Sequence, residues 1–162
     1  MFPVGDLHIN PIQVYLDDRV QLYNVIEGVL EQTGSAKLTI TTFSTSEEFL
    51  RRIYKMRQRG LIRHARLITD FKAAQKTAIL YQFMAQVFDD VFLAPNHSKV
   101  VLVDAVTARV AIVTSQNQTR GNRTEAGVIL NDSGVYDTLS KKVEVLINNS
   151  ANLNELRAAN HR

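Results

Sequence analysis

The chain has 162 residues, of which 45% are hydrophobic and 22% charged, a composition typical of one soluble domain with a core of its own. It contains no cysteine, which excludes a disulfide framework, thiolate metal sites and a cysteine nucleophile. No apolar run approaches the roughly 18 residues of a membrane span. The opening stretch, MFPVGDLHINPIQ, has no secretory signal pattern, so we expect a cytoplasmic protein without a membrane partner.

The net charge of +3 is distributed unevenly along the chain. Segment 51–66, RRIYKMRQRGLIRHAR, contains no acid and seven basic residues: Arg51, Arg52, Lys55, Arg57, Arg59, Arg63 and Arg66. One basic patch on a mildly acidic body indicates a polyanionic partner. A solvated helix face would explain the same charges, and both interpretations stay open.

The first part of the chain alternates between predicted strands and helices. We expect a short strand at 12–16 and then a helix from Asp18 to a C-cap at Gly34. The apolar residues of this helix share one face: Leu22, Val25, Ile26, Val29 and Leu30. Segment 36–43 alternates and is rich in Thr and Ile, which predicts a strand. Ser44 and Glu47 then form a capping box that opens a helix ending near Gly60.

A strand at 65–70, a helix at 73–88 and a strand at 90–94 are expected next. The helix places five apolar residues inward: Ile79, Leu80, Phe83, Met84 and Val87. After Pro95, segments 98–104 and 109–115 predict a hairpin, followed by a strand at 125–130 and a helix at 135–150. Because strands alternate with helices and no linker or repeat interrupts them, we expect one α/β domain over 1–162, with a central mixed sheet flanked by helices.

Polar side chains occupy the open end of the predicted hairpin. His97 and Lys99 stand at the start of its first strand, and Ser115 and Asn117 stand at the end of its second. Residues two apart share one face of a strand. If the turn is centred on Thr107, His97 faces Asn117 and Lys99 faces Ser115, with opposed Cβ atoms about 5 Å apart. This register predicts one cluster of four polar groups.

The four side chains suit a phosphate group. Imidazole is a nucleophile or a proton carrier near neutral pH, and an ammonium, a hydroxyl and a carboxamide can all donate to phosphate oxygens. One histidine without neighbouring carboxylates makes a poor metal site. We therefore predict a phosphate pocket centred on His97, with neither a metal nor another cofactor.

The pattern His97-x-Lys99-x4-Asp104, followed by Ser115-x-Asn117, resembles the HKD signature of the phospholipase D superfamily. Segment NRTEAGVIL resembles the stretch that follows this signature and supplies an acidic residue, here Glu125. The resemblance covers the second half by motif and the whole chain by the order of its elements. It implies a phospholipase D-like α/β sandwich with one HKD half-unit, similar to the minimal bacterial endonucleases of that family, which form homodimers.

The resemblance also implies a role for each residue. In a homodimer, one His97 attacks phosphorus and forms a phosphohistidine, while its symmetry mate protonates the leaving group and then activates water. Lys99 and Asn117 neutralise the phosphate oxygens, and Ser115 assists them. Glu125 accepts the second N–H of the imidazole and fixes its tautomer.

Three further residues have less specific predicted roles. By the same resemblance, Asp104 is a structural partner that bonds at the turn or at the dimer seam. Arg120 and Arg123 lie in the loop QTRGNRTE and are candidate ligands for substrate phosphates, although loop arginines are more often simply solvated.

The predicted function is a metal-independent phosphodiesterase, foremost a nuclease acting on DNA or RNA, with any sequence specificity supplied by a protein partner. The first alternative is a catalytically inactive module that binds nucleic acid or protein. Two features support it: Thr114 stands where the family has glycine, and nine residues (105–113) separate Asp104 from Thr114, more than in the family. A phospholipid phosphodiesterase is the second alternative.

Overall fold

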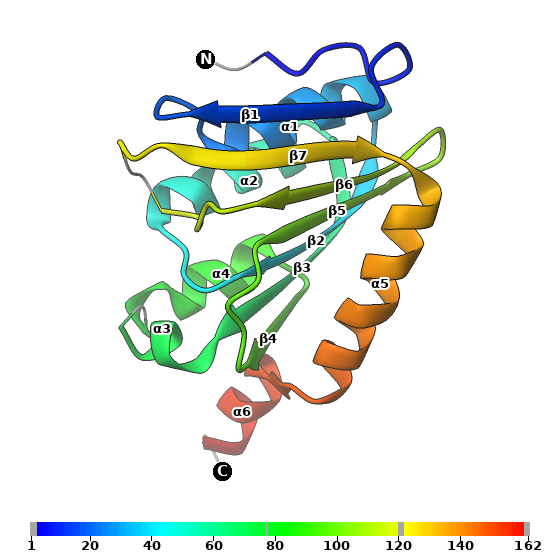
Figure 1. Cartoon of the computed structure of the whole chain (residues 1–162). Coiled ribbons are helices and arrows are strands. Elements are labelled where there is room, and N and C mark those ends of the chain that lie inside the picture. The colour runs from blue at the N-terminus through cyan, green and yellow to red at the C-terminus, as the bar shows by residue number, and fades with distance from the viewer. Residues whose placement is uncertain (1–2, 77, 120–121, 161–162) are drawn as a thin grey trace.

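The computed structural model describes residues 3–76, 78–119 and 122–160 and contains an eight-stranded sheet in the order β1-β7-β6-β5-β2-β3-β4-β8 (Figure 1). The strands are β1 Ile12–Asp17, β2 Ala36–Thr42, β3 Ile62–Asp70, β4 Asp90–Ala94, β5 Val100–Ala105, β6 Arg109–Thr114, β7 Glu125–Asn131 and β8 Ala151–Asn152. The helices are α1 Leu22–Thr33, α2 Glu47–Gln58, α3 Phe71–Lys76, the 3-10 turn η1 Ala78–Leu80, α4 Tyr81–Val87, α5 Ser133–Asn148 and α6 Leu153–Asn160. Within the described ranges, no helix is long and apolar enough to cross a membrane.

The sheet is mixed, which confirms the prediction. β2, β3 and β4 run parallel to one another, and their connections pass through helices, as parallel pairs require. β5 pairs antiparallel with β2 and continues into the meander β5-β6-β7. β1 then pairs antiparallel with β7 and forms one edge of the sheet.

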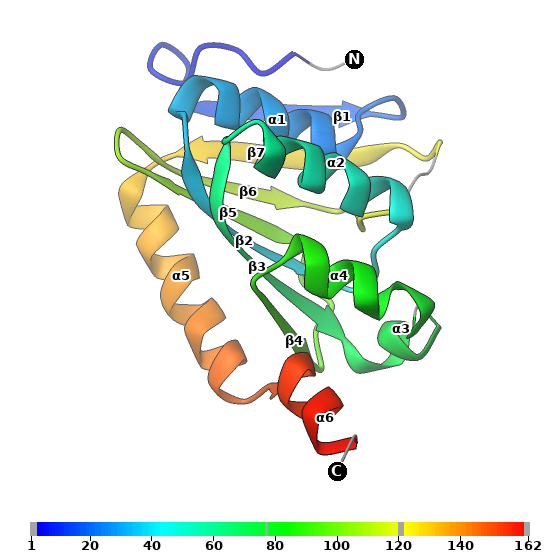
Figure 2. The same ribbon diagram turned by 180° about the vertical axis from the view of Figure 1, so that it is seen from behind.

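Helices lie on both faces of the sheet (Figures 1 and 2). α1, α2 and α4 cover one face and close the larger core, which contains all five apolar residues predicted for the first helix. α5 lies on the opposite face, where Val143 packs on β3, β5 and β6 in a smaller core. The β1 side of this second face is open: Ile12, Val14 and Leu16 are 65%, 67% and 76% exposed.

Two predicted helix starts are wrong, and side-chain hydrogen bonds explain both. α1 begins at Leu22 and not at Asp18, because the Asp17 carboxylate accepts the N–H of Arg19 at 2.7 Å and turns the chain after β1. The N-cap of α2 is Ser46, whose hydroxyl accepts the N–H of Phe49, so the capping box predicted at Ser44 is not formed.

The single helix predicted over 73–88 is also wrong. The chain forms α3, then the 3-10 turn η1, and then α4. Because the tighter 3-10 turn changes the spacing of side chains, Ile79 points outward and is 90% exposed, whereas Met84 and Val87 are buried as predicted.

Asp70, at the end of β3, ties this helical segment to the chain that follows β4. Its carboxylate accepts the N–H of Lys72 at 2.8 Å, in the first turn of α3, and the N–H of Asn96 at 2.9 Å. Burial by itself would raise the pKa of Asp70, but the hydrogen bonds from the N–H groups of Asn96, Lys72 and Ala73 outweigh it and hold the pKa below its usual value.

The first prediction concerns this carboxylate. Because its pKa is lowered by folding, Asp70 contributes stability that is present above about pH 4, the ordinary carboxyl range, and is lost as the pH falls through the lower folded value. Asp70→Asn should therefore lower the free energy of unfolding by about 1–3 kcal/mol at pH 7. Denaturant unfolding of both proteins between pH 7 and pH 3 should show this gap narrowing on acidification. Asp18→Asn, at an exposed carboxylate, is the control; a gap that widens toward pH 3 would contradict the prediction.

Candidate active site

Six strands begin or end along one edge of the sheet, which crosses the strand direction and is not the edge formed by β1. The carboxyl ends of the parallel strands β2, β3 and β4 meet there. Because β5 runs antiparallel to β2, with Val100 opposite Thr41, the start of β5 lies at the same edge. The end of β6 and the start of β7 join it through the meander, where Thr114 pairs with Gly127. His97, Lys99, Ser115, Asn117 and Glu125 all belong to these strand ends or to the segments beside them.

Asn96 fixes the segment that carries the histidine. This side chain is only 7% exposed. Its amide donates to the carbonyl of Thr42 at 3.0 Å, and its Oδ1 accepts the hydroxyl of Ser98 at 2.6 Å. Together with the bond from its own N–H to Asp70, these contacts connect the ends of β2, β3 and β4 directly in front of His97.

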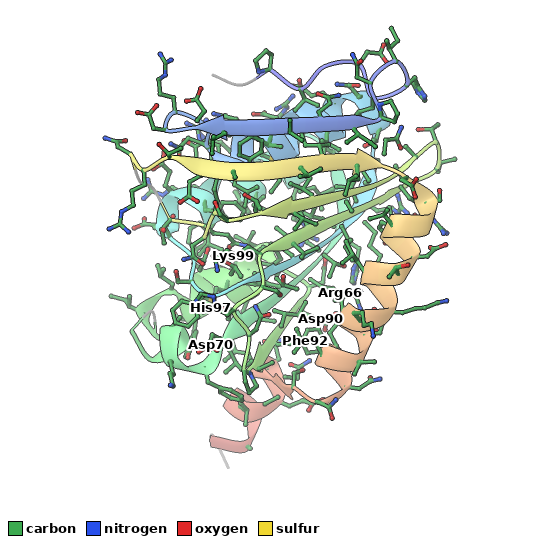
Figure 3. The ribbon with its side chains drawn as sticks, viewed as in Figure 1. Arg66, Asp70, Asp90, Phe92, His97 and Lys99 are labelled. Carbon is green, nitrogen blue, oxygen red and sulfur yellow. The ribbon has the colours of Figure 1, made fainter. Side chains whose placement is uncertain are left out.

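His97 and Lys99 lie together on this edge, with Asp70 nearby (Figure 3). The Lys99 ammonium is 3.3 Å from the Nδ1 of His97 and donates to the His97 carbonyl at 2.8 Å. The ring of Phe43, which directly follows β2, packs against the imidazole with centroids 5.0 Å apart and a tilt of 44°. His97 is exposed, so an imidazole with a fixed cation beside it is open to an anionic substrate.

The register predicted for the hairpin is wrong by one residue. β5 and β6 pair Val100 with Val113 and Asp104 with Arg109, and a two-residue turn at 106–107 is closed by the N–H of Ala105 bonding to the carbonyl of Ala108 at 3.0 Å. Lys99 therefore lies opposite Thr114, whose N–H donates to the Lys99 carbonyl at 3.1 Å. Ser115 and Asn117 do not face Lys99 and His97 across the hairpin as predicted.

Ser115 instead makes its contacts with the start of β7. Its hydroxyl donates to the carboxylate of Glu125 and accepts the N–H of Ala126 at 3.0 Å. Its own N–H donates to the carbonyl of Ala126 at 2.9 Å. Within the described residues, no hydrogen bond joins this Ser115–Glu125 pair to the His97–Lys99 pair. Asn117 is half-buried, and its Oδ1 has no hydrogen-bond partner among the described residues.

Asp104 is placed at the far end of β5, by the hairpin turn. Its carboxylate is 3.3 Å from the Nε of Arg109, which also donates to Asp137 of α5 at 3.0 Å and lies over the ring of Tyr136. This ion-pair cluster joins the turn to α5 and does not include His97. Arg123 is exposed in the loop before β7, and Arg120 lies outside the described residues.

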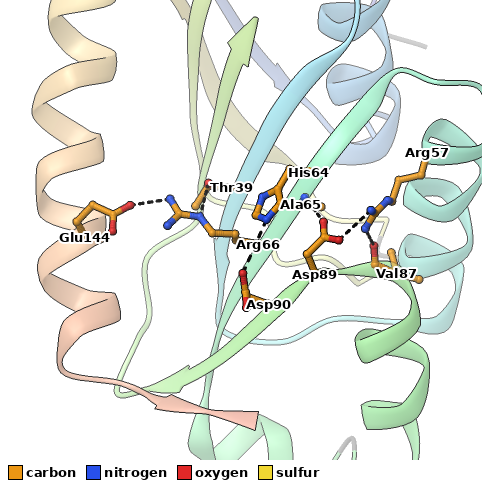
Figure 4. Close-up of polar contacts among 9 residues, drawn as sticks. All are labelled: Thr39, Arg57, His64, Ala65, Arg66, Val87, Asp89, Asp90 and Glu144. Atoms are coloured by element: carbon orange, nitrogen blue, oxygen red, sulfur yellow. Dashed lines mark hydrogen bonds and ion pairs between the residues drawn. The ribbon is translucent and has the colours of Figure 1, made fainter. Parts of the chain in front are cut away.

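The basic segment 51–66 does not form one patch. Figure 4 shows Arg57 and Arg66 on different parts of the fold, each held by an acid. Four of the seven cations have carboxylate partners: Arg51 with Glu47, Arg57 with Asp89 at 3.1 Å, Arg59 with Glu27 and Glu31, and Arg66 with Glu144 at 2.7 Å. Acids distant in the sequence pair with three of the seven cations, so the net positive charge of this segment is smaller in the fold than in the sequence, and its role as a polyanion-binding surface stays a prediction.

Sequence reasoning did not identify several side chains that build this edge. Asn96 and Phe43 could have been noticed, because each stands directly beside the histidine motif or a strand end, where polar and aromatic residues are rarely accidental. Tyr15 carried no such signal. It lies in a different strand from the motif, and only the pairing of β1 with β7 brings its hydroxyl to Thr114, 2.8 Å away.

The sequence matches no protein-family model and no curated protein. Solved structures do match. Nuc from Salmonella typhimurium, a phospholipase D family member, superposes with a TM-score of 0.65 at 14% identity, covering 87% of this chain and 96% of Nuc. NucT from Helicobacter pylori gives a TM-score of 0.69 at 14% identity, covering 86% of this chain and 97% of NucT.

TrmBL2, an archaeal chromatin protein with a novel mode of DNA binding, gives a TM-score of 0.61 at 10% identity and covers 88% of this chain and 54% of TrmBL2. At such low identities the superpositions show only that the backbone arrangement is similar. They agree with the mixed sheet, its flanking helices and the order of elements described above. This chain has the phospholipase D-like fold seen in Nuc and NucT.

Proposed function

We propose that the protein is a metal-independent phosphodiesterase that cleaves phosphodiester bonds of DNA or RNA at an active site shared by two copies of the chain. The observation that supports this most is the exposed His97–Lys99 pair, with the ammonium 3.3 Å from the Nδ1 of the imidazole, on a phospholipase D-like sheet. Attack on an anionic phosphodiester needs a nucleophile beside fixed positive charge, and this pair supplies both.

In the proposed reaction, a ring nitrogen of one His97 attacks phosphorus and the bond from phosphorus to the leaving oxygen breaks. The His97 of the second copy donates its proton to that oxygen. The same imidazole then takes a proton from water, and the resulting hydroxide attacks the phosphorus of the phosphohistidine, which breaks the phosphorus–nitrogen bond and releases the first imidazole. The products are an alcohol end and a phosphate monoester, and both histidines return to their starting states.

The other side chains are proposed to support this reaction. Lys99 neutralises the negative charge of the phosphate oxygens and Asn117 donates hydrogen bonds to them, with Ser115 assisting. Glu125 holds the Ser115 hydroxyl in one chain and is the carboxylate proposed to orient an imidazole once substrate and a second copy are bound. Arg120 and Arg123 are proposed ligands of flanking phosphates, whereas Asp104 is proposed to hold the hairpin turn and not to take part in the chemistry.

Two copies are required because the reaction uses one histidine as a nucleophile and another as a proton donor, and each chain supplies one histidine at the site. A twofold axis near His97 would provide both. The open face beside β1 is the surface that best fits a second copy. Val14, Val128 and Val113 form one apolar row across β1, β7 and β6, since Val14 pairs with Val128 and Val128 with Val113.

This apolar row is exposed to solvent in one copy of the chain. Val14 and Val113 are 67% and 40% exposed, and Ile12 and Leu16 extend the row along β1 on the same face. Contiguous exposed apolar area of this kind marks interaction sites. We therefore propose that this face, next to α5, packs against its symmetry mate.

A catalytically inactive DNA-binding module is the second candidate. It is favoured by Thr114, which stands where the phospholipase D signature has glycine, and by the likeness of the fold to a DNA-binding chromatin protein. A phospholipid phosphodiesterase ranks third, because no feature of the described residues favours a lipid head group over a nucleic acid. The experiment that follows separates these candidates.

The second prediction is that the protein degrades plasmid or single-stranded DNA, or RNA, in the presence of EDTA. His97→Ala should reduce the rate by about 10³-fold or more, because nucleophile and proton donor are both lost. Rapid quenching with labelled substrate should trap a phosphohistidine in the wild type only. His8→Ala, at an exposed histidine away from the site, is the matched control and should keep full activity.

Three outcomes would overturn the nuclease proposal. Cleavage that EDTA abolishes and His97→Ala retains would refute the mechanism. DNA retention without turnover in the wild type, unaffected by His97→Ala, would support the binding module instead. Release of head groups from phospholipid vesicles without cleavage of nucleic acid would support the lipid enzyme.

The third prediction concerns the shared site. Val14→Asp places a charge in the apolar row, so it should convert dimers into monomers in sedimentation velocity and lower activity in parallel, with little change in the melting temperature. Val106→Asp, at a hairpin tip that is 94% exposed, should alter neither property. A wild type that sediments as a monomer at assay concentrations would contradict the shared site.

A further inference from the structure

Thr114 has specific partners in this chain. Its Oγ1 accepts the N–H of Gln116 at 3.1 Å and lies 2.8 Å from the hydroxyl oxygen of Tyr15 and 3.0 Å from the carbonyl of Ala126, so its one proton can be donated to either of these two acceptors. The threonine hydroxyl therefore connects three strands, namely β1, β6 and β7. A glycine at this position could make none of these contacts, so the side chain is built into the local structure and not merely tolerated there.

Tyr15 reaches Thr114 by crossing β7. Its ring lies directly against Gly127, where a Cβ atom would stand only 2.3 Å from a ring carbon. Any other residue at position 127 would displace the ring. Glycine is therefore required here because the Tyr15 ring approaches the backbone closely, and not because the backbone conformation is unusual. The tyrosine is 6% exposed, and its hydroxyl donates to the Oε1 of Gln116 at 2.6 Å.

Gln116 completes the cluster. Its Nε2 donates to the carbonyl of Val20 at 2.7 Å, and the side chain is 6% exposed. Tyr15, Thr114 and Gln116 thus form a hydrogen-bonded group, which we name the Tyr15 clamp, on the face of the sheet covered by α1, α2 and α4; Tyr15 and Gln116 are buried in it and Thr114 is half-buried. Burial raises the pKa of Tyr15, so the phenol stays neutral and keeps its proton for hydrogen bonding at physiological pH.

The clamp holds the two residues that flank Ser115. Thr114 precedes this serine and Gln116 follows it, and both are tied to the same tyrosine hydroxyl. Ser115 in turn holds the Glu125 carboxylate and the N–H of Ala126. Asn117 is the next residue along. Small shifts in the clamp would therefore move the hydroxyl, the carboxylate and the carboxamide that the proposed reaction uses.

We infer that Tyr15 and Thr114 are positioning residues, which set the Ser115–Glu125 pair and Asn117 in the geometry that receives the substrate phosphate. The inference rests on the proposed phosphodiesterase function and deepens it. It also explains the presence of Thr114, the residue that favoured an inactive module, because the threonine hydroxyl has a hydrogen-bond partner in β1, namely Tyr15. Neither side chain touches the phosphate in this scheme; both act through residues 115–117.

The fourth prediction tests this inference with Tyr15→Phe, which keeps the ring against Gly127 and removes only the hydroxyl. Because a misplaced Ser115–Glu125 pair should affect turnover more than binding, kcat should fall about tenfold or more while KM stays within about twofold. Thr114→Val should have a similar effect. The double variant should be no worse than either single one, since all three break the same clamp.

A readout independent of activity accompanies the kinetics. Amide hydrogen exchange at Gln116 and Ala126 should accelerate in Tyr15→Phe, because these N–H groups donate to the Oγ atoms of Thr114 and Ser115. Tyr136→Phe is the matched control: burial also raises the pKa of this phenol, but it lies on α5, away from the clamp, and its removal should change neither kcat nor exchange.

The outcomes distinguish a failure of the positioning inference from a failure of the proposed phosphodiesterase function. A wild type that cleaves no phosphodiester overturns the proposed function, and the positioning role falls with it. An active wild type whose Tyr15→Phe variant keeps its kcat overturns the positioning inference alone. Unchanged exchange at Gln116 and Ala126 in that variant would overturn the clamp itself, whatever the activity.

Discussion

The antiparallel pairing of β5 with β2 determines where the candidate active site lies. Parallel strands present their carboxyl ends at one edge of a sheet. A meander that followed β4 in the parallel direction would begin at the opposite edge. Here the chain after β4 turns back through Asn96, and Val100 takes its place opposite Thr41. The histidine, the lysine and the ends of β6 and β7 consequently meet beside β2, β3 and β4.

One copy of the chain holds two separate polar pairs at this edge. His97 with Lys99 has the groups for nucleophilic attack and charge neutralisation. Ser115 with Glu125 has a hydroxyl and a carboxylate bound to each other. Within the described residues, no hydrogen bond joins the two pairs. In the proposed function, a bound phosphate and the second copy of the chain would bring their groups together.

The sequence carried enough information for the type and order of most elements. Alternation and helical spacing depend on local burial, so they identified β1 to β7 and the buried face of α1 correctly, whereas the two-residue strand β8 was not predicted. The hairpin register could not be obtained in this way. Val100 to Val103 are buried on both faces of the sheet, so the apolar pattern looks the same after a slip of one residue. Only the length of the turn fixes the register of this hairpin.

Long-range partners limited the prediction of the site for the same reason. Residues His97, Lys99 and Glu125 stand out in the sequence because of their spacing, and the fold brings them to one edge. The acids that neutralise Arg57, Arg59 and Arg66 come from other elements, so a local count of charge overestimated the basic surface. Tyr15 was equally invisible, because its partners lie about a hundred positions later in the chain.

That separation has a consequence for biosynthesis. Among the described strands, β1 pairs with β7 alone, and Ile12 pairs with Leu130, more than a hundred residues later in the chain, so β1 leaves the ribosome long before its partner. Such a contact closes a very large loop, which is entropically slow to form. Until β7 has been made, the alternating strand IQVYLD has no partner strand in its own sheet, and unpaired apolar strands of this kind are prone to aggregate during folding. β1 can therefore join the sheet only after synthesis has passed Leu130.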